Sequence, residues 1–141
     1  MRIFLDANIL FSASKSDGAI RRLLELLIEG GHELWGDAFV VEEARRNLET
    51  KFPEALGRLE AVLEETQLLA TSARAALPAE GATLLPEKDR PVLAAAIRAR
   101  CDVRVTGDRT HFGPLYGRTV SGVTVHSPSS LAASVFGSGS T

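Results

Sequence analysis

Five short β-like runs alternate with helical segments along this chain, and the alternation restricts the folds that it can adopt. The runs span Ile3–Leu5, Glu33–Trp35, Gln67–Leu69, Val103–Thr106 and Val123–His126. Strands that alternate with helices predict an α/β fold, in which right-handed crossovers make the strands parallel and helices cover both faces of the sheet. We therefore expect a three-layer α/β/α arrangement around a parallel sheet of roughly five strands.

The segments between the runs carry apolar residues at the helical period. The clearest, Ala19–Glu29, ends at the Gly30-Gly31 pair, which favours a helix C-terminus. Further helices are expected at Ala38–Leu48, Pro53–Val62, Pro91–Arg100 and after Ser127-Pro128. The composition of Ala70–Pro86 is typical of an irregular connection, which could include one short helix. We expect one domain over residues 1–136, followed by a flexible Gly/Ser tail over 137–141.

Composition excludes several classes of protein. The net charge of −2 argues against a protein that holds nucleic acid through a broad basic surface, although a local basic patch is compatible with it. Cys101 is the single cysteine, so the chain cannot form an internal disulfide. No apolar stretch approaches the roughly 20 residues that a membrane-spanning helix needs. A soluble cytoplasmic protein without a membrane segment is the expectation.

Two aspartates follow predicted strands directly. Asp6 comes after the first run, and Asp108 comes after the fourth run across Thr106-Gly107. Ligands of open parallel sheets bind beyond the carboxyl ends of the strands. We therefore expect both carboxylates at this edge, exposed at the rim rather than buried. Taken singly, each has a purely structural explanation, because an aspartate after a strand often caps a helix or stabilises a turn.

Two further acidic candidates lie at helices. Val40, Val41, Ala44 and Leu48 form the apolar arc of the segment Ala38–Leu48. Glu43 lies about 115° from the centre of this arc and Glu42 about 145°, so Glu43 is better placed to face inward; a solvated helix face is the alternative. Asp89 lies two residues before Pro91, at the start of the helical pattern Pro91–Arg100, where it could cap the helix or point into a site.

The acidic residues occur in motifs that resemble those of a known family. The stretches are LDANILFSA, VVEEARRNL, KDRPVLAAA and VTGDRTHF. They resemble the acidic motifs of the PIN-domain ribonucleases, above all the bacterial and archaeal members that act as toxins of toxin-antitoxin pairs, and the resemblance runs from Arg2 to about Leu131. It implies a sheet of order 3-2-1-4-5. It also implies a metal-binding and catalytic quartet of Asp6, Glu43, Asp89 and Asp108, with Asn8 and Thr106 as supporting polar residues.

The chemistry of such a quartet requires a cation. Two carboxylates 4 Å apart repel each other by about 4 kcal/mol at an effective dielectric constant near 20. An all-oxygen ligand set favours Mg²⁺ or Mn²⁺ over zinc. The resemblance then implies a metal-dependent endoribonuclease that hydrolyses RNA phosphodiester bonds. Arg46, Arg90 and Arg109 adjoin the acidic positions and could contact substrate phosphates, with plain surface solvation as the alternative.

Other functions and roles stay open from the sequence. A catalytically inactive PIN-like module for binding RNA or protein is one alternative. An aspartate-dependent phosphotransfer domain is less favoured, because its lysine has no counterpart among Lys15, Lys51 and Lys88. A cognate antitoxin is an expected partner of a toxin. The apolar stripe of Ala19–Glu29 could form a homodimer or could cover the sheet.

Several polar and aromatic residues are interpreted as structural. Asp17 and Asp37 lie near predicted junctions and are interpreted as helix caps. His32 and His126 are expected to be structural, and His111 is kept out of the catalytic set because nothing in the sequence would orient it. Trp35, Phe39 and Phe52 are expected in the core, because no interleaved aromatic and basic pattern indicates a surface for stacking bases.

Overall fold

The central feature of the fold is a six-stranded sheet. The computed structural model describes residues 1–69, 90–107 and 117–137. The strands are β1 (Arg2–Leu5), β2 (Glu33–Asp37), β3 (Thr66–Leu69), β4 (Val103–Val105), β5 (Thr119–Val120) and β6 (Val123–His126). They follow the order β3-β2-β1-β4-β6-β5, and every neighbouring pair is parallel except β5 with β6. The predicted α/β fold and the central pairing of the first and fourth strands are confirmed.

The structure adds one strand to the five expected from the sequence. β5 has two residues and pairs antiparallel with β6, which is the predicted fifth strand. The connection between them is Ser121-Gly122, and both residues have positive φ, 49° and 87°. A two-residue hairpin turn of type I′ requires positive φ at both central residues, a backbone conformation that glycine adopts without strain. A two-residue strand is too short to leave an alternating pattern in the sequence.

The helices expected from the sequence begin and end close to their predicted bounds, and α1 (Ala7–Lys15) is an additional helix that was not predicted. The others are α2 (Ala19–Glu29), α3 (Ala38–Lys51), the short 3₁₀ helix η1 (Pro53–Ala55), α4 (Leu56–Glu64), α6 (Arg90–Arg98) and α8 (Pro128–Val135). α3 continues three residues beyond the expected Leu48. The expected helix at Pro53–Val62 divides into η1 and α4. The predicted connection Ala70–Pro86 and tail residues 138–141 lie outside the described residues.

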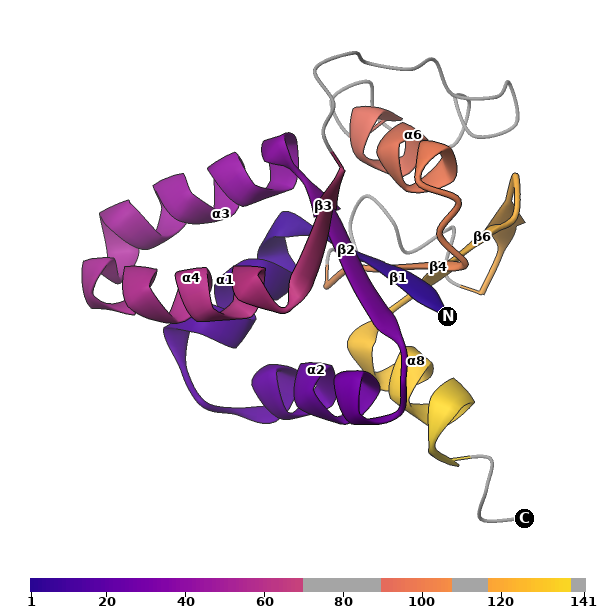
Figure 1. Ribbon diagram of the computed structural model, residues 1–141, viewed down its shortest axis with the longest axis horizontal. Coiled ribbons are helices and arrows are strands. Elements are labelled where there is room, and N and C mark those ends of the chain that lie inside the picture. Colours follow the sequence, from indigo (N-terminus) through magenta and orange to yellow (C-terminus); the bar gives the residue numbers. More distant parts are fainter. Residues whose placement is uncertain (70–89, 108–116, 138–141) are drawn as a thin grey trace.

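The helices lie on opposite faces of the sheet. α1, α3 and α4 lie on one side, and α6 lies on the other (Figure 1). The strand order explains this division, because the crossovers from β1 to β2 and from β2 to β3 run in one direction across the sheet. The crossover from β3 to β4 returns in the opposite direction, so a right-handed connection places its helix on the opposite face. α2 contacts both β2 and α8.

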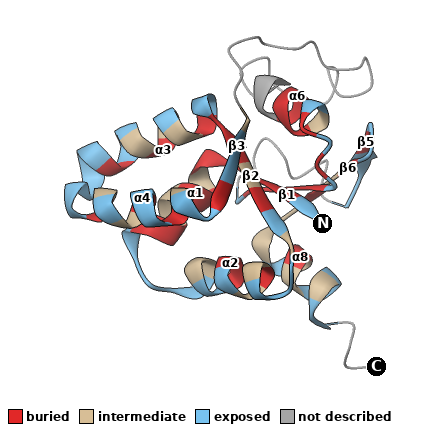
Figure 2. Ribbon diagram, in the orientation of Figure 1, coloured by how far each residue is buried: buried red, intermediate tan, exposed pale blue. Residues whose placement is uncertain are grey.

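The hydrophobic core follows the central strands and the helix faces that cover them (Figure 2). Leu23, Leu24 and Leu27 of α2 are buried in it, so this part of the apolar stripe packs inside the chain. Trp35 is partly buried against the core. The prediction for Phe39 and Phe52 was wrong, because each is 36% exposed. Phe39 lies on the side of α3 away from its buried residues Val40, Ala44 and Leu48. Phe52 directly follows the last residue of α3, and its ring centroid lies 5.9 Å from that of Phe11.

None of the described helices is long and apolar enough to cross a membrane.

Candidate functional site

Asp6 links the central strand β1 to helix α1 at the carboxyl edge of the sheet. Its backbone N–H donates to Val105 O at 3.2 Å, which extends the pairing of β1 with β4 by one residue. Its Oδ1 accepts from the Ala7 N–H at 2.9 Å and caps α1. The side chain is buried, with the residue 8% exposed. The expectation of an exposed rim carboxylate is therefore wrong, and the burial of its charge needs a compensating partner.

The compensating partner is Arg104 of β4. Arg104 Nη2 lies 2.8 Å from Asp6 Oδ2, and the arginine is 1% exposed. Arg104 pairs in register with Phe4, which pairs with Trp35. Gly36, the next residue of β2, faces Val40 of α3. Because side chains alternate between the two faces of a sheet, Arg104 must lie on the opposite face, which α6 covers.

A second buried carboxylate lies within the electrostatic reach of Arg104. Asp37 ends β2, is 4% exposed and caps α3 through a hydrogen bond from Val40 N–H to Oδ1 at 3.1 Å. Burial raises the pKa of Asp37, while its hydrogen bonds and the positive charge of Arg104 act in the opposite direction. The predicted cap is confirmed. The guanidinium of Arg104 thus acts on the carboxylates of both Asp6 and Asp37.

Thr106 and Asn8 complete the hydrogen bonding around Asp6. Thr106 is fully buried, and its Oγ1 donates to Asp6 Oδ2 at 2.6 Å. The same hydroxyl accepts from Asn8 Nδ2 at 3.1 Å, while Asn8 Oδ1 accepts from the Gly107 N–H at 2.8 Å. Asn8 therefore connects the start of α1 to the residue that directly precedes Asp108. The structure brings these two predicted supporting residues together with Asp6.

The remaining members of the predicted quartet are described only in part. Glu43 lies on α3, which packs against α1, and is half-buried, whereas Glu42 is exposed. This agrees with the helical phase inferred from the sequence. Asp89 and Asp108 lie outside the described residues, as do Arg109, His111 and Lys88. Their roles stay predictions.

Two of the predicted phosphate-binding arginines, Arg46 and Arg90, lie within the described residues. Arg46 is exposed on α3, and Arg90 is the first residue of α6. α6 ends beside the start of β4, since the Cys101 N–H donates to Ala96 O and the Asp102 N–H donates to Arg2 O. The helix therefore begins toward the opposite, carboxyl edge of the sheet. This is the edge on which Asp6 lies.

The donor chemistry at Asp6 fits a hard divalent cation. A carboxylate offers about four lone-pair directions on its two oxygens. Within the described residues, Oδ2 accepts from Thr106, Asn8 and Arg104, whereas Oδ1 accepts one bond, from Ala7. Oδ1 therefore keeps capacity for a Mg²⁺ or Mn²⁺ ligand bond. Over residues 1–69, 90–107 and 117–137, no three His, Cys, Asp or Glu residues form a group that could hold a metal by themselves.

Sequence reasoning missed Arg104 and its link to Asp37. The signal was present in the segment Val103–Val105, where a charged residue stands between two valines of a central strand. A strand that is covered on both faces has no exposed position for a charge. A basic residue there therefore indicates a buried acidic partner.

A separate hollow of about 570 Å³ lies at the amino edge of the sheet, opposite the carboxyl edge that carries Asp6. Its lining comes from α2, α4 and the amino end of β2, including Arg21, Ile28, Leu34, Val62 and Glu65. Neither Asp6 nor Glu43 contributes to it. The hollow and the carboxylate site are therefore distinct features of the described structure.

Comparison with known proteins agrees with the observed fold. In the crystal structure of VapBC2 from Rickettsia felis bound to a DNA fragment from their promoter, one chain matches with a TM-score of 0.62 at 14% identity. The match covers 90% of this chain and 98% of that chain, and at this identity it shows a shared fold. No curated protein matches the sequence. The sequence profile of the PIN domain matches residues 2–110, which is most of the chain, and the protein therefore belongs to the PIN-domain family.

Proposed function

We propose that this protein is a metal-dependent endoribonuclease that hydrolyses RNA phosphodiester bonds. PIN domains are generally nucleases. The observation that carries the proposal is the placement of Asp6 at the carboxyl edge of the central strand, held by Thr106 and Arg104 with capacity left on Oδ1. A carboxylate held in this way is suited to bind a cation beside a substrate phosphate.

Four residues are proposed to form the metal-binding and catalytic set: Asp6, Glu43, Asp89 and Asp108. Asp6 and Asp108 are assigned to the main ion, with Asp89 binding directly or through water and Glu43 orienting the attacking water. Asn8 and Thr106 hold Asp6 and the backbone of Gly107 in place. When bound, Mg²⁺ or Mn²⁺ supplies Lewis acidity that activates water and stabilises charge on the phosphate.

The substrate is proposed to be RNA, contacted through phosphates by Arg46, Arg90 and Arg109. Phosphate contacts position a nucleic acid and carry no sequence information directly. The protein would then act in the cytoplasm on cellular RNA.

The role proposed for this nuclease is that of a toxin with a cognate antitoxin. The solved neighbour VapBC2 is described as bound to a DNA fragment from their promoter, and its chain shares the fold of this one. Growth arrest on expression in a bacterial host, relieved by co-expression of the protein of a small adjacent reading frame, tests this role. A homodimer is a further proposal, which light scattering of the purified chain tests.

The activity is tested by incubating single-stranded RNA and DNA of the same sequence with the chain in Mn²⁺ and in EDTA. We expect cleavage of RNA in Mn²⁺, none in EDTA, and loss of cleavage by about 100-fold or more in Asp6→Asn. Asp17→Asn is the matched control, because Asp17 is exposed in the connection between α1 and α2. Its activity should equal that of the wild type.

RNA retention without cleavage in either Mn²⁺ or Mg²⁺ would support the alternative of an inactive RNA-binding module. Equal cleavage by Asp6→Asn and wild type would exclude Asp6 from the site.

A further inference from the structure

Arg104 places a permanent positive charge beside a proposed metal ligand. We propose that Arg104 is an internal counter-cation of the site, which fixes Oδ2 of Asp6 and lowers the affinity of the site for its divalent ion. Arg104 is a positioning residue in this proposal, because it acts through Asp6. The inference rests on the proposed function in one respect, the assignment of Asp6 as a metal ligand.

The first support is the geometry of Asp6. Its Oδ2 lies 2.8 Å from Arg104 Nη2 and accepts the Thr106 hydroxyl at 2.6 Å, while Oδ1 accepts the Ala7 N–H at 2.9 Å. With both oxygens held, the carboxylate cannot rotate without breaking a hydrogen bond or the ion pair. Oδ1 is therefore the atom through which a cation can bind, and Oδ2 stays with Arg104 and Thr106.

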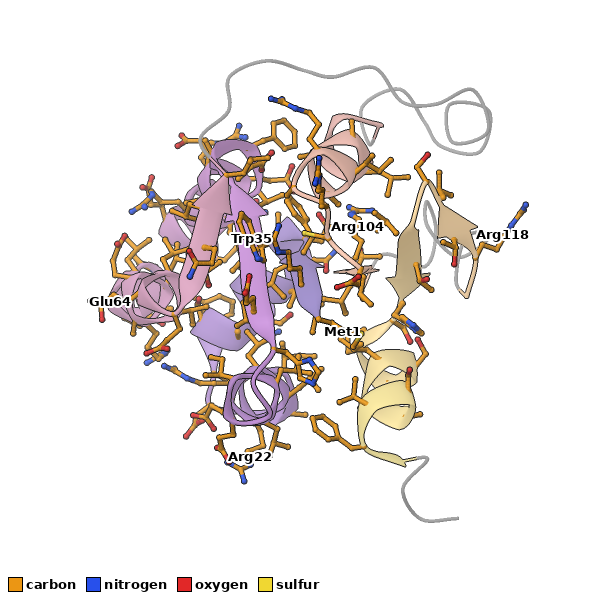
Figure 3. The ribbon with its side chains drawn as sticks, turned by 45° about the vertical axis from the view of Figure 1, so that its right-hand side comes forward. Met1, Arg22, Trp35, Glu64, Arg104 and Arg118 are labelled. Atoms are coloured by element: carbon orange, nitrogen blue, oxygen red, sulfur yellow. The ribbon has the colours of Figure 1, made fainter. Side chains whose placement is uncertain are left out.

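The second support is the location of the arginine. Figure 3 shows Arg104 inside the molecule, between the strands and α6, whereas Arg118 projects from the outer edge of the sheet. Arg104 is 1% exposed, so solvent does little to screen its charge. An arginine in a protein does not lose its proton, so the charge remains at every physiological pH.

The third support is the count of charges. Asp6 and Asp37 are both buried, and Arg104 acts on both. The Asp6–Arg104 ion pair is neutral overall, whereas Asp6 without Arg104 would carry a charge of −1. A divalent cation at Oδ1 is attracted by the carboxylates and repelled by the guanidinium. Removing the guanidinium charge should therefore tighten cation binding.

The test is calorimetric titration of the purified chain with Mn²⁺ alone. We expect Arg104→Gln to bind Mn²⁺ about tenfold more tightly than the wild type, because close charge pairs in poorly solvated sites are coupled by at least this factor. In EDTA the melting temperature of Arg104→Gln should fall, and Mn²⁺ should raise it by more than it raises that of the wild type. Arg118→Gln makes the same charge change on an exposed residue and should leave Mn²⁺ affinity within about twofold.

A second variant keeps the inference testable if Arg104→Gln does not fold. Asp37→Asn retains a good helix cap and removes one of the two carboxylates that compensate Arg104. We expect it to bind Mn²⁺ several-fold more weakly than the wild type. Unchanged or weaker Mn²⁺ affinity in Arg104→Gln would overturn the counter-cation role, as would tighter Mn²⁺ binding by Asp37→Asn than by the wild type.

Different measurements test the counter-cation role of Arg104 and the proposed nuclease function. The nuclease function fails if the wild type cleaves no RNA, whatever its affinity for Mn²⁺. The counter-cation role fails on the affinities alone, and it also fails if neither the wild type nor Arg104→Gln takes up Mn²⁺. Tighter Mn²⁺ binding by Arg104→Gln supports it even where no cleavage is found.

Discussion

Asp6 and Arg104 form an ion pair of 2.8 Å between neighbouring strands, and both residues are buried. Removing charges of this kind from water costs several kcal/mol per ion, which only close pairing and additional hydrogen bonds offset. Asp6 gains these bonds from Thr106 and Ala7. The ion pair and these hydrogen bonds therefore offset the cost of burying the charge of Asp6. The pair also links the residue that follows β1 to strand β4.

The first prediction concerns the energetic coupling of this pair. Arg104→Met should lower the free energy of unfolding in EDTA by about 3–5 kcal/mol, because it leaves a buried carboxylate without its counter-charge. Asp6→Asn should destabilise the wild type but stabilise Arg104→Met, since a neutral amide needs no counter-charge. Urea unfolding of the four proteins measures the coupling. Additive effects of the two substitutions would show that the pair is not coupled.

A second prediction concerns the hydroxyl of Thr106. Thr106→Val keeps the shape of the side chain but removes the donor to Asp6 and the acceptor for Asn8. The free energy of unfolding should fall by about 1–3 kcal/mol, as expected when buried polar groups lose a partner. Thr106→Ser keeps the hydroxyl and should retain most of the stability. Equal losses in the two variants would instead point to packing of the methyl group as the source.

A third prediction concerns stability below neutral pH. Burial lowers the pKa of His126 from its ordinary value of 6.5, and burial together with the N-terminal ammonium lowers that of His32. In the window below 6.5 the unfolded chain binds more protons at these residues than the folded chain, so stability falls as pH falls.

The melting temperature in EDTA, measured from about pH 7.5 to about pH 5.5, tests this direction. The double variant His32→Gln with His126→Gln should show a smaller decline than the wild type. His126 Nδ1 lies 2.9 Å from Ser130 Oγ, a contact that the glutamine amide can replace. A decline of the same size in the double variant would assign the pH dependence to other groups.

A fourth prediction concerns the reactivity of Cys101. The residue is 3% exposed, and burial raises the pKa of its thiol from 9.0 to about 12. The fraction of thiolate at a given pH below 9 is therefore about a thousandfold smaller than in the unfolded chain. A thiol reagent should label the native protein far more slowly than the protein in guanidinium chloride, with Cys101→Ser as the blank. Rapid labelling of the native chain would show that this part of the core opens readily.

The sequence alone was enough to predict the α/β class, the central strands and the place of Asp6 at the end of β1, because these depend on local periodicity and on residues that follow strands directly. The cap interpretations of Asp6 and Asp37 rested on equally local chemistry, and the structure confirms both. The PIN-domain motifs are likewise readable along the chain, and the family match agrees with them.

Only the tertiary structure decided how the charge of Asp6 is compensated. The pairing of β1 with β4 brings Arg104 and Thr106 beside Asp6, and no local rule relates residues so far apart in the chain. The exposure of Phe52 likewise depends on where α3 ends in the fold, since Phe52 is its C-cap. Periodicity reports which residues share a face. Burial of a charge depends on which other strand the chain brings next to it.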